Sequence, residues 1–87
     1  MQPGKPIHLS AHARQQLTFR GVREEEVVDC IRTTAWEPAE LGRLQCAKDY
    51  TFQAQWNGVF YATKLVQPIF VEEPNELVVV TIYSYYF

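Results

Sequence analysis

Two sets of side chains in this sequence have the chemistry needed to act on a phosphate group. The first set follows one side of an expected helix, where an imidazole, an amide and a guanidinium stand four residues apart: His12, Gln16 and Arg20. An imidazole titrates near neutral pH and moves protons, and a guanidinium can hold a phosphate through two parallel hydrogen bonds. The spacing therefore indicates a phosphate site in which His12 carries a proton and Arg20 binds the anion.

The same side chains also have a structural interpretation. Arg20 would pair with Glu24, bond to carbonyl groups near Gly21 and cover apolar surface with its stem. His12 would then have only a structural role at the start of the helix. The sequence leaves both interpretations open.

The second set belongs to a strand-rich segment. Lys64 is expected on the outer face of a sheet, with Tyr83 and Tyr85 from the last strand and with Arg43 and Lys48 nearby. Cations that stabilise the charge developing on a phosphate, with a Tyr or Lys that moves protons, suit phosphodiester cleavage without a metal. A solvated sheet face is the alternative. For this second set, the nuclease interpretation requires one concave basic surface on which four side chains converge: Lys64, Arg43, Lys48 and Tyr83.

The sequence indicates no metal site and no cofactor. It has no phosphate loop, dinucleotide fingerprint, nucleophile elbow or metalloprotease motif. The spacing of His8 and His12 would suit a metal held by one helix, but Ser10 between them is the better helix start. Cys30 and Cys46 match no zinc or redox spacing, so we expect two reduced, partly buried thiols.

Composition indicates one small globular domain over residues 1–87. A chain of 87 residues, 47% hydrophobic and 14% aromatic, can form one modest core. No run approaches the roughly 18 apolar residues of a membrane span, and no signal peptide is evident, so a cytoplasmic location without membrane contact is expected. The net charge of −2 means that RNA binding would need a local basic patch.

The N-terminal part predicts a helical pair over residues 10–34. Ser10 can cap a first helix, Ala11–Arg20, and Gly21 ends it in the usual C-terminal position. A second helix is expected over Arg23–Thr34, with three glutamates in its first turn. Its inner stripe would consist of Val27, Cys30, Ile31 and Thr34. The residues before the pair, 1–6, are expected to be an extended arm with little to hold it.

Residues 43–87 have strand-like patterns that predict an antiparallel sheet. Asn57-Gly58 favours a two-residue turn in which Trp56 pairs with Val59. Counted back from this turn, the register places Lys64 outside and puts three pairs on the core face: Ala54 with Tyr61, Phe52 with Thr63 and Tyr50 with Leu65.

A second hairpin is expected to turn at residues 72–76 and to lead into a last strand, Leu77–Tyr85. Val78, Val80 and Ile82 are expected on its core face, and Thr81, Tyr83 and Tyr85 on its outer face. The predicted fold class is α+β, with two N-terminal helices packed on a three- to four-stranded antiparallel sheet.

One ordered set of residues resembles a known family. The set consists of His12-Ala13-Arg14, Arg20-Gly21-Val22, Val27 and a last strand ending in Val80-Thr81-Ile82-Tyr83. It is similar to a small bacterial family of unknown function with His-Ala and Arg-Gly-Ile or Arg-Gly-Val at these places. That family resembles the RelE/ParE toxin superfamily in layout, and its members often resemble the toxin partner of a small zinc-finger antitoxin. In this chain Arg23 replaces the family's usual Ser or Thr helix cap.

The resemblance implies a RelE-like toxin-family domain. Nuclease members of the superfamily cleave messenger RNA on the ribosome without a metal, using Arg, Lys, His and Tyr side chains. Carried over to this chain, the expected catalytic residues are His12, Lys64 and Tyr83, and the expected RNA phosphate-binding residues are Arg20, Arg43 and Lys48. The expected partners are an antitoxin protein and an RNA or the ribosome.

The alternative is a catalytically inactive interaction module of the same fold. Its aromatic last strand would form a homodimer or extend the sheet of a partner protein.

Overall fold

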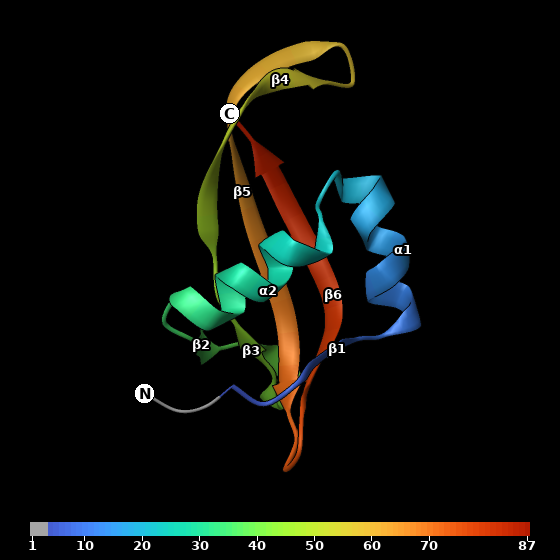
Figure 1. The fold of residues 1–87 in the computed structure, drawn as a ribbon, viewed down its shortest axis with the longest axis vertical. Coiled ribbons are helices and arrows are strands. Elements are labelled where there is room, and N and C mark those ends of the chain that lie inside the picture. The colour runs from blue at the N-terminus through green and yellow to red at the C-terminus, as the bar shows by residue number, and fades with distance from the viewer. Residues whose placement is uncertain (1–3) are drawn as a thin grey trace.

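The computed structural model of the protein describes residues 4–87, which form an α+β domain as predicted (Figure 1). The two helices are α1 (Ala11–Arg20) and α2 (Glu24–Thr33), and a short 3-10 turn, η1 (Glu40–Gly42), follows them. The strands are β1 (Ile7–Leu9), β2 (Glu37–Pro38), β3 (Leu44–Gln45), β4 (Lys48–Trp56), β5 (Val59–Glu72) and β6 (Leu77–Tyr86).

The sheet is larger than the sequence suggested. Within the described residues it has six strands in the order β1-β6-β5-β3-β2, and β4 also pairs with β5. β1 runs parallel to β6, with Ile7 opposite Leu77, whereas the other pairs are antiparallel. The expected three to four antiparallel strands are therefore joined by short flanking strands, one of which is parallel.

The segment before β1 is held in place, contrary to the expectation of a loose arm. The ammonium of Lys5 lies 3.0 Å from the carboxylate of Glu72, and the amide of Leu77 donates to the Pro6 carbonyl at 2.9 Å. Arg32 of α2 donates to the Lys5 carbonyl at 2.8 Å. The part of the predicted arm that precedes residue 4 lies outside the described residues.

The helix ends follow the local signals of the sequence. The Ser10 hydroxyl accepts a hydrogen bond from the Ala13 amide at 3.1 Å, and Gly21 ends α1 with a left-handed φ of 66°. At the start of α2 the Glu26 carboxylate accepts from the Arg23 amide at 2.9 Å. A residue in the first turn thus supplies part of the capping that the Arg23 side chain cannot provide.

The predicted register of the first hairpin holds near its turn and fails beyond it. Trp56 pairs with Val59 and Ala54 with Tyr61, as Asn57-Gly58 indicated. Between Ala54 and Thr51 a β-bulge places two residues of β4, Phe52 and Gln53, opposite one residue of β5. The pairing below the bulge is shifted by one, and it joins Thr51 with Thr63, Tyr50 with Lys64 and Asp49 with Leu65.

A second irregularity corrects the expected core face of the last strand. The register between β5 and β6 shifts where Val80 stands without a partner, between the Phe70–Val79 and Ile69–Thr81 pairs. The buried residues of β6 are therefore Leu77, Val79 and Ile82. The prediction was right for Ile82 and wrong for Val78 and Val80.

Figure 1 shows where the two helices lie relative to the sheet. α2 crosses one face of the sheet, α1 stands beside β6, and the tip of the β4–β5 hairpin bends toward the end of α1. Between α2 and the sheet lies the core, whose largest members include Phe70, Ile31, Ile82 and Val66. No helix of the described residues is long and apolar enough to cross a membrane.

Candidate functional site

Side chains from α1 and β6 meet on one side of the molecule. The imidazole Nε2 of His12 lies 3.4 Å from the Thr81 hydroxyl, and the Arg20 guanidinium carbon lies 5.4 Å from the centre of the Tyr83 ring. Arg20 Nε donates to the Gln16 side-chain oxygen at 3.0 Å. We call these five residues the α1–β6 cluster. It brings together three of the predicted site residues: His12, Arg20 and Tyr83.

The periodicities of the two elements explain this gathering. Residues four apart on a helix share one side, so His12, Gln16 and Arg20 form a stripe along α1. Residues two apart on a strand share one face, so Thr81 and Tyr83 point the same way. Both lie on the sheet face opposite α2, as predicted. Their partners on β5, Ile69 and Gln67, alternate along that strand with residues whose side chains are buried under α2.

The structural role expected for Arg20 is performed by other residues. Glu24 pairs with Arg14 at 3.1 Å, which corrects the expected pairing with Arg20. The Arg20 carbonyl accepts from the Ser84 hydroxyl at 2.8 Å and also from the Tyr86 hydroxyl. Among the described residues no carboxylate lies within ion-pair distance of the Arg20 guanidinium. Its terminal nitrogens are therefore free to bind an anion, on the side of α1 that also carries the exposed ring of His12.

Lys64 lies on the opposite face from the one predicted. Its side chain is only 6% exposed, and its ammonium donates to the Glu26 carboxylate at 2.8 Å and to the Gly21 carbonyl at 2.9 Å. Burial alone raises the pKa of Glu26, but hydrogen bonds from Lys64 and from the Arg23 amide outweigh it and lower that pKa overall. Lys64 is enclosed between the sheet and the helices, so it cannot reach a substrate in solvent.

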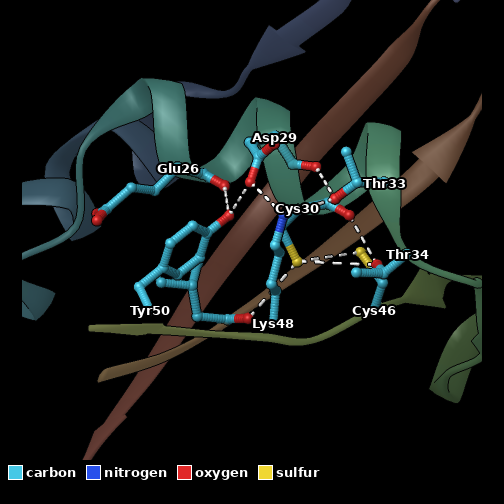
Figure 2. A network of polar contacts seen from close by, with 9 residues as sticks. Glu26, Asp29, Cys30, Thr33, Thr34, Cys46, Lys48 and Tyr50 are labelled. Carbon is cyan, nitrogen blue, oxygen red and sulfur yellow. Dashed lines mark hydrogen bonds and ion pairs between the residues drawn. The ribbon is translucent and has the colours of Figure 1, made fainter. Parts of the chain in front are cut away.

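Lys48 also faces α2, where it belongs to a polar network (Figure 2). Its ammonium donates to Asp29 at 2.7 Å and to the Thr33 hydroxyl at 3.0 Å, and the Tyr50 hydroxyl donates to Asp29 at 2.6 Å. Hydrogen bonds from Lys48 and Tyr50 lower the pKa of Asp29. Burial, followed by the contact with Asp29, raises the pKa of Tyr50. The network attaches α2 to β4.

The four side chains expected to form one basic surface therefore do not converge. Lys64 and Lys48 contact α2, Tyr83 lies on the opposite face of the sheet, and Arg43 lies between η1 and β3. The predicted sheet-face nuclease site around Lys64 is not formed. What remains of the predicted catalytic set is the pair His12 and Tyr83, with Arg20 as the phosphate-binding candidate.

Sequence reasoning missed the importance of Glu26. It is 6% exposed, it accepts hydrogen bonds at the start of α2 and it neutralises Lys64. Two signals could have revealed it. Glu26 occupies the third helical position, where a carboxylate caps the helix, and it precedes Cys30 by four residues on the buried stripe.

The described residues contain no group of three or more His, Cys, Asp and Glu side chains that could hold a metal ion. No family model, curated protein or solved structure matches the chain. Function is therefore inferred from the α1–β6 cluster and from the residues that carry the family resemblance.

Proposed function

We propose that this protein is a RelE-like toxin-family domain that cleaves RNA at the α1–β6 cluster without a metal ion. The observation that supports this most is the gathering of His12, Arg20 and Tyr83 on one accessible side of α1 and β6. These are residue types that metal-free RNA cleavage uses. Two of them, His12 and Arg20, also belong to the motif that carries the resemblance.

Each side chain has a role in this proposal. Arg20 holds the phosphate through its terminal nitrogens, and its bond to Gln16 fixes the plane of the guanidinium. His12 removes the proton from the ribose 2′-hydroxyl, whose oxygen then attacks phosphorus. The bond from phosphorus to the 5′-oxygen breaks, and the Tyr83 hydroxyl donates a proton to that leaving oxygen. The products are a 2′,3′-cyclic phosphate and a new 5′-hydroxyl.

The test is expression in a bacterial host, followed by incubation of the purified protein with messenger RNA on ribosomes. We expect the wild-type protein to arrest growth and to shorten messenger RNA, and we expect His12→Ala or Arg20→Ala to abolish both effects. Arg14→Ala is the matched control, because Arg14 is a cation on the same helix but is paired with Glu24. Normal growth and intact messenger RNA under strong expression of the folded wild-type protein would contradict the proposal.

A second candidate function is protein interaction through the sheet face that α2 does not cover. Tyr83 and Tyr85 are 38% and 53% exposed there, and they pair with Gln67 and Leu65 of β5. The solvent face of an antiparallel sheet is usually polar, and exposed aromatic surface often marks an interface. A second copy of this chain is the simplest occupant, since the net charge of −2 gives little repulsion between copies.

Sedimentation at increasing protein concentration tests this second candidate. We expect a dimer that Tyr85→Glu dissociates, because a carboxylate would be buried at the contact. Leu41→Glu is the control, since Leu41 is 85% exposed in η1, away from β6. A wild-type protein that remains a monomer at all concentrations rules out self-association through this face.

A further inference from the structure

Two buried thiols lie next to each other outside the α1–β6 cluster. Cys30 belongs to α2, and Cys46 belongs to the connection between β3 and β4. Their side chains are free thiols, and the residues are 0% and 3% exposed. The two sulfur atoms are 3.5 Å apart, and Figure 2 shows them side by side below α2. The sequence predicted reduced thiols but gave no sign that they meet.

We propose that Cys30 and Cys46 form an intramolecular disulfide when the protein meets a hydroperoxide, so that the pair is a redox modification site. A disulfide bond is about 2.05 Å long, so the sulfurs must approach by roughly 1.5 Å. The fold has already brought α2 and the β3–β4 connection together. The folded chain therefore does not have to bring distant segments together to form the bond.

The surroundings of the pair assign different roles to the two thiols. The Cys30 thiol lies 3.6 Å from the Val66 carbonyl, to which it can donate, and 3.5 Å from the Cys46 sulfur. The contact with Cys30 lowers the pKa of the Cys46 thiol, whereas the same contact, followed by burial, raises the pKa of Cys30. The Val66 carbonyl also accepts from the Cys30 thiol and so favours its protonated form, which leaves Cys46 as the better nucleophile.

The position of Cys46 also gives it a route to an oxidant. It lies outside regular structure, between β3, a strand of two residues, and β4. β3 lies between β5 and the edge strand β2 and pairs with each through only two residues, so it opens locally at a lower free energy than the long strands β5 and β6. Such opening exposes Cys46, while Cys30 stays on the inner side of α2.

The reaction balances with one molecule of hydrogen peroxide per protein. The Cys46 thiolate attacks a peroxide oxygen, the O–O bond breaks, and the leaving hydroxide takes a proton to become water. Cys46 is then a sulfenic acid. The Cys30 sulfur attacks the Cys46 sulfur, the S–O bond breaks, and the second hydroxide leaves as water with the Cys30 proton. Each sulfur loses one electron, and the peroxide gains two.

The experiment treats the full chain with hydrogen peroxide, blocks remaining thiols in denaturant and analyses the protein by mass spectrometry. We expect a mass lower by two hydrogen atoms, no blocked thiol, one peptide pair joined through Cys30 and Cys46, and full reversal by dithiothreitol. The oxidised protein should also melt at a higher temperature, because the bond joins α2 to the β3–β4 connection. Folded wild-type protein that stays reduced, or that forms only disulfides between chains, overturns the proposal.

Single substitutions test the order of the two steps. Cys30→Ser should stop at a sulfenic acid on Cys46 that dimedone traps, and Cys46→Ser should leave Cys30 unmodified. Equal dimedone labelling of both variants would overturn the assignment of Cys46 as the attacking thiol. The disulfide mapping of the wild-type protein needs no substitution, so it decides the main proposal even if a variant fails to fold. None of these measurements depends on RNA cleavage.

Discussion

The Lys64–Glu26 pair and the α1–β6 cluster each contain a cation, but the first cation is buried and paired with a carboxylate and the second is not. The ammonium of Lys64 is enclosed, with a carboxylate at 2.8 Å and a carbonyl at 2.9 Å. The guanidinium of Arg20 bonds an amide oxygen and lies over an aromatic ring, but it pairs with no carboxylate of the described residues. Residue type alone suggested both cations for phosphate chemistry. Burial and the donors already in use distinguish the structural cation from the available one.

The two regions meet at Gly21, and the buried one supports the exposed one. Lys64 donates to the Gly21 carbonyl, and Tyr86 and Ser84 donate to the Arg20 carbonyl. A Cβ atom at Gly21 would lie 2.6 Å from the Trp56 ring and 2.5 Å from the Tyr86 hydroxyl. The end of α1 is therefore tightly packed, which fixes the backbone from which Arg20 extends.

The largest effect is expected from breaking the buried pair. Lys64→Met leaves Glu26 buried without its cation, which should lower the free energy of unfolding by about 3 kcal/mol or more. Urea denaturation followed by circular dichroism measures this loss. The double variant Lys64→Met/Glu26→Leu should recover part of it, because neither charge is then left uncompensated. Equal losses in the single and double variants would show that the ion pair is not responsible.

Lowering the pH is expected to reduce the free energy of unfolding by less than the Lys64→Met substitution does. The pKa of Glu26 is lowered by folding from an ordinary value of 4.5, so the unfolded chain binds more protons than the folded protein in acid. Its contribution to stability is therefore complete above about pH 4.5 and is lost as the pH falls through the folded pKa.

Urea midpoints measured across the acid range test this dependence. The double variant Lys64→Met/Glu26→Leu should lose less stability on acidification than the wild-type protein. Asp29, whose pKa is also lowered, is present in both proteins and therefore acts alike in each. Identical acid profiles would mean that Glu26 contributes nothing to the pH dependence.

The smallest effect on stability is expected in the α1–β6 cluster. His12→Ala should change the free energy of unfolding by less than about 0.5 kcal/mol, because an exposed side chain with one long contact contributes little. Arg20→Ala should cost less than about 1 kcal/mol, since it loses a cation–π contact near the surface. Thermal melting measures both. A loss from Arg20→Ala as large as that from Lys64→Met would favour the structural interpretation of Arg20.

Local signals in the sequence predicted much of the fold. Ser10, Gly21 and Asn57-Gly58 each determine the backbone conformation within a few residues of themselves, and each produced the expected cap or turn. The bounds of α1 and the start of the last strand at Leu77 followed from such signals. The α1 stripe that contributes His12 and Arg20 to the candidate site was also predictable, because helical spacing alone defines it.

The errors came from features that distant contacts determine. The bulge in β4 accompanies the packing of Phe52 against Tyr86 and against the Lys64 ammonium, with ring centres 5.1 Å apart in the first case. Nothing in the sequence around Phe52 marks a bulge. Because side chains alternate along a strand, that one-residue shift was enough to move Lys64 from the predicted outer face to the core. The parallel strand β1 was missed for a similar reason, as its partner Leu77 is far along the chain.

The pairing of β1 with β6 also governs when this protein can fold during its synthesis. β6 is the last strand of the chain, yet it supplies the partner for Ile7 and, through Ser84 and Tyr86, the hydroxyls that bond the end of α1. A ribosome therefore exposes α1 before the strand that holds it exists outside the exit tunnel. Contacts between such distant residues slow folding, so the nascent α1 must wait, unprotected, for β6 to emerge.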